Sequence, residues 1–482
     1  MTQEIKTYGS IINGETVIKS DFDILELKNP YNNETIANMS LCTKKELDEA
    51  IDGAERAYHA DMKRMPLHKR AEILTRAAEL LKERTEDFAQ TLSLEAGKPI
   101  RDARGEVGRA VQVLNFASDE AKTLHGELLP MDAAIGGENR LGMVRLYPIG
   151  VMGAITPFNF PLNLALHKLA PAVASGNAVV LKPALKTPLS ALKLAQVFYD
   201  AGLPKEALQV IIAKGSEIGD DIVTDDRIAK ITFTGSPEVG IKMRNKAGLK
   251  RITLELGSNS PNIIFEDADV DKAASSLVKA SFAFAGQVCI SSQRIFVHES
   301  IIDEFIAKFI PLVKQLKVGN PLDEDTDVGP LISSDSCERI YEWTQEAVKD
   351  GAEVLTGGSI IEGQMFEPTV VKNVNSSMKI VCQETFAPIV SIIPFKSDED
   401  AVEKANDSDY GLQAGVFTKD INRAFKLSDE LETGGVWINE VSTYRQDNYP
   451  YGGVKLSGYG KEGVKYAIRD MTEEKFVGIN LN

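Results

Sequence analysis

The stretch that decides the fold is AVVLKPALKTPLSALKLAQVFYDAGLPKEALQVII, which runs from residue 178 to residue 212. It begins with the apolar run AVVL and ends near the apolar run VII, and each run is typical of a buried strand. Thr187 and Pro188 are expected to cap and open a helix between these strands, and Gly202 is expected to end it. A strand, a helix and a second strand in this order predict a parallel β-α-β unit.

The same alternation extends in both directions from this unit. Apolar strands begin at about Val144, and residues 231–233 form a further strand that a Gly-Ser turn follows. After Glu255 the alternation resumes with a strand at 262–265, and a late strand covers 435–439. The chain is therefore predicted to be an α/β protein with a doubly wound, Rossmann-type sheet, which is typical of nucleotide-binding domains, and a second α/β domain.

Composition limits the class of protein. The chain has 482 residues, enough for two or three domains, and its formal net charge of −16 disfavours a nucleic-acid partner or an anionic membrane surface. No apolar run approaches the roughly 18 residues of a membrane span, and no basic-then-apolar leader is present. The four cysteines form no C-x-x-C pair and the five histidines are scattered. We expect a cytoplasmic protein without a metal site, a membrane partner or a nucleic-acid partner.

One of the four cysteines stands out. Cys289 lies in FAGQVCISSQR, residues 284–294, whereas a lone cysteine after apolar residues is ordinarily core filler. Gly286 permits close approach of the backbone to a ligand, and Ser291 and Ser292 are small enough to leave room around the sulfur. No histidine is adjacent, so a papain-like pair is not supported. Cys289 is therefore a candidate nucleophile whose base comes from elsewhere in the chain.

Two further residues are candidates for catalysis. Glu255 ends the apolar strand in RITLELG, and a carboxyl group buried there would have the raised pKa of a general base. Asn159 lies between two aromatic residues and two prolines in PFNFP, and a rigidly placed amide is what an oxyanion hole requires. The alternatives are a surface glutamate and a turn asparagine.

Three segments could bind a nucleotide. Lys182 follows the AVVL strand and could reach a ribose or a phosphate. Gly235 and Ser236 end a strand and start a helix, whose N-terminal dipole favours a pyrophosphate. Glu384 could hold a hydroxyl pair and Phe386 could pack a flat ring in the loop QETFAP. The alternatives are a solvated lysine, a plain helix cap and an ordinary loop. Neither the lysine segment nor the Gly-Ser segment is a G-x-G-x-x-G motif.

In combination, these segments resemble the aldehyde dehydrogenase superfamily. Over nearly the whole chain they follow the order of that family: PFNFP, LKPA, FTGSPEVG, LELG, GQVC, ETFAP and PYGGVKLSG. The resemblance implies an NAD(P)-binding domain formed by residues 1–129 and 149–257, and a catalytic domain formed by 258–448. It also implies an oligomerisation arm formed by 130–148 and 470–482, and a homodimer or homotetramer. The apolar C-terminal tail would pair with another subunit or form an edge strand of its own sheet.

The resemblance also implies a mechanism. Cys289 would attack an aldehyde to give a thiohemiacetal, while Asn159 and the backbone N–H of the cysteine stabilise the oxyanion. Hydride transfer to NAD or NADP would leave a thioester, and Glu255 would activate the water that hydrolyses it. Family members that pass the acyl group to coenzyme A typically lack this glutamate, so Glu255 favours hydrolysis.

The cofactor residues follow from the same resemblance. Many NAD-preferring relatives carry a glutamate where this chain has Leu185, which Lys186 follows. Loss of a carboxylate and gain of a cation favour a 2′-phosphate, so we expect use of NADP alongside NAD. The residues that the resemblance assigns to cofactor binding are Thr156, Phe158, Lys182, Gly235, Ser236, Glu384 and Phe386.

The segment NEVSTYRQD resembles the S-T-[FY]-R-x-D segment of dehydrogenases for lactaldehyde and related small hydroxyaldehydes. Its Arg445 could bind a substrate anion, or it could simply pair with Asp447. Val288 departs from the arginine of non-phosphorylating glyceraldehyde-3-phosphate dehydrogenases. The leading substrate is a small hydroxyaldehyde such as lactaldehyde or glycolaldehyde. The alternatives are an anionic aldehyde (sulfolactaldehyde, succinic semialdehyde or glyceraldehyde-3-phosphate) and, from another class, a non-catalytic binding or scaffold protein.

Overall fold

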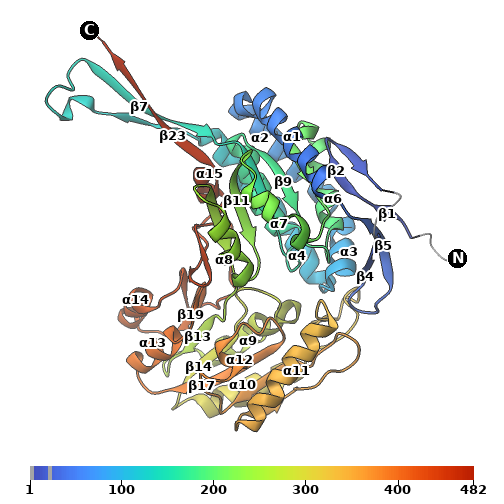
Figure 1. Cartoon of the computed structure of the whole chain (residues 1–482). Helices are drawn as coiled ribbons and strands as arrows, with labels where there is room; N and C mark the ends of the chain where they lie inside the picture. Colours follow the sequence, from blue (N-terminus) through green and yellow to red (C-terminus); the bar gives the residue numbers. More distant parts are fainter. Residues whose placement is uncertain (1–4, 20–23, 482) are drawn as a thin grey trace.

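The computed structural model describes residues 5–19 and 24–481, which form two α/β bodies and a projecting arm (Figure 1). The first body is built on an eight-stranded sheet, and its central strands β12, β11, β8, β9 and β10 are parallel. The order across this sheet is β22 (Gly458–Tyr459), β12 (Arg251–Glu255), β11 (Ile228–Thr234), β8 (Val151–Ile155), β9 (Ala178–Lys182), β10 (Leu208–Val210), β2 (Ser10–Ile12) and β3 (Glu15–Val17).

Helices cover both faces of the first sheet, as the doubly wound prediction requires. In β9, Val179 and Leu181 pack with one set of helices, whereas Ala178 and Val180 pack with the other. The first set is α2 (Leu67–Glu83), α3 (Thr85–Ala96), α4 (Ile100–Thr123), α5 (Asn163–Ser175) and α6 (Leu189–Asp200). The second set is α1 (Lys44–Ala60) and α7 (Gly215–Thr224), while α8 (Pro237–Lys246) follows β11.

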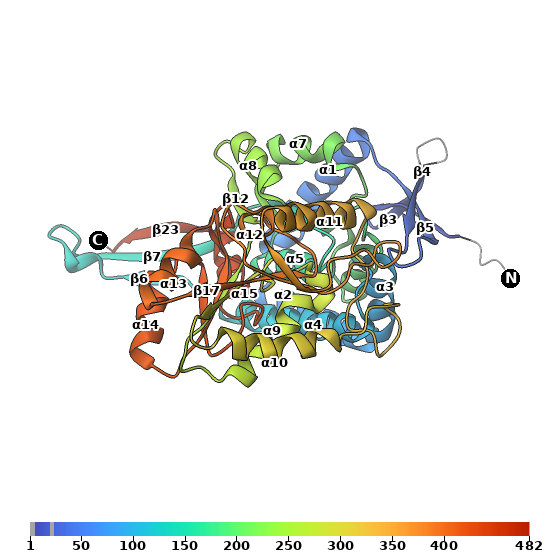
Figure 2. The ribbon, with the colours of Figure 1, turned by 90° about the horizontal axis from the view of Figure 1, so that it is seen from below.

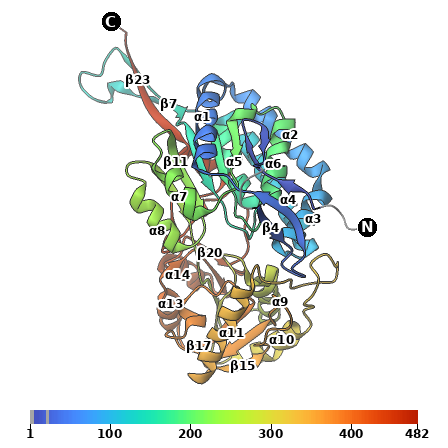
Figure 3. The same ribbon diagram turned by 45° about the vertical axis from the view of Figure 1, so that its right-hand side comes forward.

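The second body contains a seven-stranded sheet that is parallel except at β15. Its order is β15 (Glu353–Thr356), β16 (Thr369–Lys372), β17 (Ile389–Phe395), β14 (Arg294–His298), β13 (Pro261–Ile264), β19 (Gln413–Phe417) and β20 (Gly435–Ile438). Its helices are α9 (Val270–Phe282), α10 (Ile302–Lys314), α11 (Ser334–Lys349), α12 (Lys379–Cys382), α13 (Asp398–Asn406) and α14 (Ile421–Glu430). Figure 3 shows this body below the first one, and the α/β prediction is confirmed.

Three small sheets complete the fold. One is the arm, in which β7 lies between two antiparallel partners and the C-terminal strand pairs with it over its full length (Figure 1). The arm strands are β6 (Glu127–Leu129), β7 (Arg140–Pro148) and β23 (Thr472–Asn480), and α15 (Val464–Asp470) leads into β23. The others are β1 (Thr7–Tyr8), β5 (Thr35–Ser40) and β4 (Ile24–Lys28), and the pair β18 (Tyr410–Gly411) and β21 (Val454–Lys455). The apolar tail thus has a partner within its own chain.

The expectation that Thr187 caps α6 is wrong. Within the described part of the chain, the buried hydroxyl of Thr187 has no hydrogen-bond partner. Glu95 from α3 caps the helix instead, because its carboxylate accepts the N–H groups of Leu189 and Ser190 at 2.8 and 3.1 Å. A cap supplied from 94 residues away leaves no local sequence signal. The strand expected at 210–212 is also shifted towards the N-terminus, because β10 ends at Val210, the first residue of the expected strand.

None of the helices in residues 5–19 and 24–481 has the length and apolar character that a membrane crossing requires.

Candidate functional site

The carboxyl ends of four parallel strands bring together the residues expected around the cofactor. Thr156 follows β8, Lys182 ends β9, Gly235 and Ser236 follow β11, and Glu255 ends β12. Because these strands are parallel neighbours, all five residues lie at one edge of the first sheet. Ligands of open α/β sheets bind at this edge.

Several polar groups at this edge have few protein partners, as expected of groups that bind a ligand. Burial lowers the pKa of Lys182 to about 8, and its Nζ donates to the carbonyl of Pro183 at 3.5 Å, its one hydrogen bond among the described residues. Among the residues described, the buried hydroxyl of Thr156 has no partner. Ser236 is the N-cap residue of α8, and its side chain makes no capping bond within the described chain. A nucleotide supplies the hydroxyls and phosphates that such groups bind, so these residues fit a dinucleotide.

The loop before β17 brings two further candidates to the site. Glu384 Oε1 accepts the N–H of Ser258 at 2.9 Å, and burial raises the pKa of Glu384 to about 7. Phe386 has a φ of 47°, in the left-handed region, and its ring meets the ring of Phe158 edge-on at 5.8 Å. The two aromatic residues predicted to lie near the cofactor are therefore in contact.

A left-handed turn places Cys289. Phe284, Ala285 and Gly286 have φ values of 48°, 54° and 68° in succession. A Cβ at Gly286 would lie 2.2 Å from the carbonyl oxygen of Ala387, so only glycine fits this close approach. Ser292 does more than leave room, since its buried Oγ accepts the side-chain amide of Asn262 at 2.9 Å. Close contacts therefore fix the chain both before and after Cys289.

Asn159 reaches the sulfur. Its Nδ2 lies 4.0 Å from Sγ of Cys289 and also donates to the carbonyl of Gln287 at 3.1 Å. Burial raises the pKa of Cys289 to about 12, and the carboxylates of Glu384 and Glu255 act in the same direction. The sulfur is therefore a neutral thiol at neutral pH, and it needs a base to become a nucleophile.

Glu255 has the setting of a general base for a water molecule. Both of its carboxylate oxygens are buried, and neither has a hydrogen-bond partner in residues 5–19 and 24–481. Burial raises its pKa well above the usual range, and the neighbouring Glu462 adds to the effect. A Cβ at Gly452 would lie 2.8 Å from Oε1, so this glycine leaves the space that the carboxyl group occupies.

Arg445 lies at a cavity of about 530 Å³ that opens beside the nucleophile segment. Its Nη2 donates to Glu462 at 3.1 Å, its Nε is 3.7 Å from Asp447, and its guanidinium lies 3.6 Å from the ring centre of Tyr451. Arg445 therefore pairs with carboxylates and also lines the cavity, and its binding of a substrate anion stays a prediction. The charged residues that line the cavity are Arg109, Lys279, Glu440 and Arg445, and Val288 lies among its apolar residues.

The sequence analysis missed a buried charged network behind this cavity. Asp447 Oδ1 accepts from Nη2 of Arg109 at 2.7 Å and lies 3.0 Å from Nε2 of His167. Lys168 Nζ donates to Glu462 at 2.9 Å. A signal was present, since His167 and Lys168 are polar residues in the otherwise apolar run LALHKLAPAVA, where burial is costly without a partner. Arg109 gave no such signal, because it lies in a helix rich in charge.

The chain is similar to known proteins of one family. Residues 17–477 match the aldehyde dehydrogenase family. The chain is 47% identical over 478 residues to a 3-sulfolactaldehyde dehydrogenase of Priestia aryabhattai, covering 99% of both chains. It is 43% identical over 474 residues to a lactaldehyde dehydrogenase of Methanocaldococcus jannaschii, covering 97% of this chain and 99% of the relative.

A solved structure is similar as well. It is the glyceraldehyde-3-phosphate dehydrogenase GapN from Methanocaldococcus jannaschii complexed with NADP, at a TM-score of 0.91 and 42% identity. The match covers 95% of this chain and 100% of that one. The fold and the site therefore define an α/β oxidoreductase of the NAD(P)-dependent dehydrogenase class. The chain belongs to the aldehyde dehydrogenase family, and the resemblance found in the sequence is confirmed.

Proposed function

We propose that the chain oxidises a short hydroxyaldehyde with an anionic tail, of the 3-sulfolactaldehyde class, to the carboxylic acid. The observation that carries this proposal is the cavity beside Val288, into which two guanidinium groups, Arg109 and Arg445, bring positive charge. Lys279 and Glu440, which also line the cavity, balance each other. Arginine forks suit sulfonates, phosphates and carboxylates.

The charge balance behind the cavity favours one negative charge on the substrate. Arg109, Lys168 and Arg445 supply three positive charges, and Asp447 and Glu462 supply two negative charges, which leaves a net charge of +1. The pKa values of both carboxyl groups are lowered by their cationic neighbours against the effect of burial, so both are ionised at neutral pH. A monoanionic aldehyde would neutralise the remaining charge.

We propose catalytic roles for Cys289, Asn159 and Glu255, and the contact between Asn159 and Cys289 supports them. The sulfur of Cys289 bonds to the aldehyde carbon as the thiol proton passes to a water molecule, while Asn159 Nδ2 donates to the oxyanion. Lys182, Ser236 and Glu384 would hold NAD(P)⁺, which would supply the acceptor for the hydride that the carbon loses. Cys289 then carries the acyl group as a thioester. Glu255 takes a proton from a water molecule that attacks this thioester, and the products are the carboxylic acid and the free thiol.

The proposed cofactor is NADP, with NAD as a second substrate. Lys182, Ser236 and Glu384 would hold the adenosine ribose, the pyrophosphate and the nicotinamide ribose. Leu185 stands where a glutamate would repel a 2′-phosphate, and Lys186 beside it is exposed. The similar GapN structure is a complex with NADP, which supports this choice.

A second candidate substrate is lactaldehyde, which is neutral. The observation that favours it is that Arg445 already has Glu462 as a partner at 3.1 Å. A relative at 43% identity is named lactaldehyde dehydrogenase. In this case the guanidinium would contact the substrate hydroxyl, and its charge would stay balanced within the protein.

Steady-state kinetics with both cofactors separate the two candidates. The absorbance of reduced nicotinamide is followed with 3-sulfolactaldehyde, lactaldehyde, succinic semialdehyde and glyceraldehyde-3-phosphate. The anionic proposal expects kcat/KM for 3-sulfolactaldehyde to exceed that for lactaldehyde by at least roughly tenfold. Equal values, or a preference for lactaldehyde, would contradict it. High ionic strength should narrow the gap only slightly, because buried charges are weakly screened.

We also propose that the division into domains expected from the sequence holds, with residues 130–148 and 470–482 as an oligomerisation arm. Four large apolar side chains of this arm are exposed among the described residues: Ile135, Phe476, Ile479 and Leu481. β23 is the edge strand of the arm sheet, and edge strands commonly pair with a second chain. A homodimer or homotetramer would cover the exposed side chains and the strand edge.

We also propose a location in the cytoplasm, which the four free cysteines support.

A further inference from the structure

The start of helix α4 carries three charged residues outside the site described above. Lys98, Asp102 and Glu106 are four residues apart, so they share one face of the helix and its lead-in. Lys98 and Glu106 form an ion pair in which each side chain is only 1% exposed. A fully buried ion pair is costly to desolvate, so its position calls for an explanation.

Glu106 holds the segment that carries Asn159. Its Oε1 accepts the backbone N–H groups of Leu162 and Asn163, each at 3.1 Å. These groups lie at the N-terminus of α5, three and four residues after Asn159. A carboxylate at this place satisfies two N–H groups that the helix itself cannot.

Lys98 connects that segment with the nucleophile segment. Its Nζ lies 3.7 Å from the ring centre of Phe160 and 4.6 Å from the ring centre of Phe284. Phe160 is the neighbour of Asn159, and Phe284 begins the left-handed turn that leads to Cys289. A desolvated ammonium between two aromatic rings attracts both, so Lys98 holds the two segments against each other.

Asp102 adds a third contact on the same face. The backbone of Phe284 hydrogen-bonds to its carboxylate. Asp102 from α4 and Lys279 from α9 line a common cavity, and Figure 2 shows these helices close together. The backbone at the start of the strained turn is thus also anchored to α4.

We propose that Lys98, Asp102 and Glu106 are positioning residues that fix the oxyanion amide of Asn159 relative to the sulfur of Cys289. This inference rests on the proposed catalytic roles of these two residues. The two segments are 130 residues apart in the chain, and Nδ2 and Sγ must meet within a narrow range of distance and angle. This face of α4 sets the distance and angle between the two atoms without contacting the substrate.

The test replaces the ion pair by neutral residues of similar size, Lys98→Met with Glu106→Gln, so that no lone charge remains buried. The expected result is a fall in kcat of roughly tenfold to a hundredfold, with KM and cofactor affinity within about twofold. The pre-steady-state rate of hydride transfer should fall with kcat. Unchanged kcat per folded molecule would overturn the proposal.

Two further variants separate positioning from folding. Lys98→Arg keeps the cation between the rings and should retain more kcat than Lys98→Met, whereas equal kcat in both would overturn the proposal. Lys230→Met is the matched control, because Lys230 is also buried and bonds Asp470 and Thr253 away from both segments. It should lower the Tm and leave kcat unchanged. A Cys289→Ala variant that still turns over would instead refute the proposed catalytic roles.

Discussion

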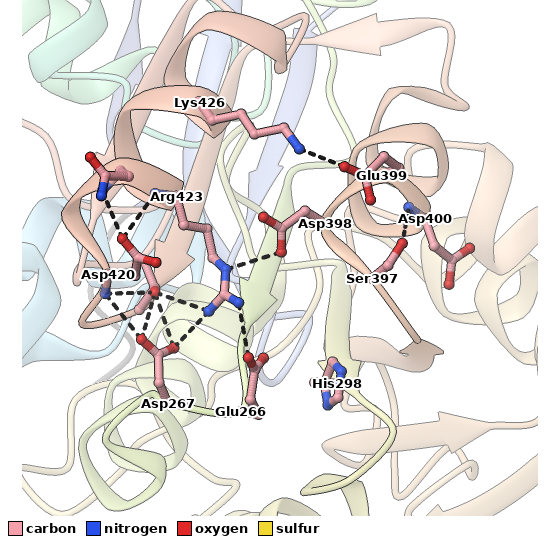
Figure 4. Close-up of polar contacts among 12 residues, drawn as sticks. Glu266, Asp267, His298, Ser397, Asp398, Glu399, Asp400, Asp420, Arg423 and Lys426 are labelled. Atoms are coloured by element: carbon pink, nitrogen blue, oxygen red, sulfur yellow. Dashed lines mark hydrogen bonds and ion pairs between the residues drawn. The ribbon is translucent and has the colours of Figure 1, made fainter.

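Two arginines of this protein each lie among carboxylates, yet their surroundings differ in one respect. Arg423 donates from Nη2 to Glu266 at 2.9 Å, from Nη1 to Asp267 at 3.2 Å and from Nε to Asp398 at 3.0 Å (Figure 4). Arg445 is more deeply buried, but its Nε has no hydrogen-bond partner in the described part of the chain.

The difference separates a structural network from one at the proposed active site. Asp267 also accepts the N–H groups of Lys419 and Asp420 and the hydroxyl of Thr418, so the Arg423 network ties β13, β19 and α14 together (Figure 4). Near Arg445, the carboxyl group of Glu255 lacks any partner among the described residues. Buried polar groups are ordinarily satisfied, and unsatisfied ones mark the place where a ligand or reactant belongs.

The largest effect is expected for Glu255→Gln. The amide cannot take the proton of the attacking water, so kcat should fall by roughly 10³-fold or more. Stopped-flow absorbance should still show a burst of about one equivalent of reduced cofactor, because hydride transfer precedes the hydrolysis that this residue assists. A variant that keeps steady-state turnover would contradict the assignment of the hydrolytic base.

The next effect sharpens the contrast between the two arginines. Arg445→Met should lower kcat/KM for an anionic aldehyde by roughly a hundredfold, and lower it less for lactaldehyde. Arg423→Met is the control, with an expected loss of about 1–3 kcal/mol in the free energy of unfolding and no change in kcat/KM. An identical loss for both aldehydes in Arg445→Met would remove the argument for an anionic substrate.

A smaller effect concerns the cofactor. Leu185→Glu should lower kcat/KM with NADP by roughly tenfold, because a carboxylate would face the 2′-phosphate, and should leave the value with NAD similar. Lys186→Gln, which removes the adjacent cation, should also lower the ratio of kcat/KM with NADP to kcat/KM with NAD, but by a smaller factor. An unchanged NADP:NAD ratio in both variants would show that this corner does not select the cofactor.

The smallest expected effect is on the pH dependence of the free energy of unfolding. It has opposite signs for Glu255, near Arg445, and for Asp267, beside Arg423. Burial raises the pKa of Glu255 in the folded protein above the value of this group in the unfolded chain. The carboxyl group therefore destabilises the fold as the pH rises from about 4.3 towards the folded pKa. The pKa of Asp267 is lowered by its hydrogen bonds and by Arg423, so its contribution is present above about 3.9 and is lost in acid.

Melting curves between pH 5 and pH 9 measure both contributions. Glu255→Gln should raise the Tm relative to the unmodified protein, by an amount that grows as the pH rises. Asp267→Asn should lower the Tm across this range. If Glu255→Gln is destabilising at pH 9, the carboxyl group has a partner that the present account omits.

The sequence predicted the alternating α/β order and the residues at the strand ends because local patterns encode both. Cys289, Glu255 and Asn159 were recognised from short segments, and their roles remain predictions for the experiments above. The cap of α6 by Glu95 and the network around Asp447 could not be predicted, because each joins residues far apart in the chain. Pairings of this kind depend on tertiary packing, which a single sequence does not display.

The central claim is that Cys289 carries the acyl group during turnover. The most direct measurement is acid quenching of the Glu255→Gln variant with aldehyde and NADP, followed by peptide mass spectrometry. The account predicts the mass of one acyl group on the peptide that contains Cys289. An acyl group on Cys42, Cys337 or Cys382, or complete turnover without any adduct, would contradict it.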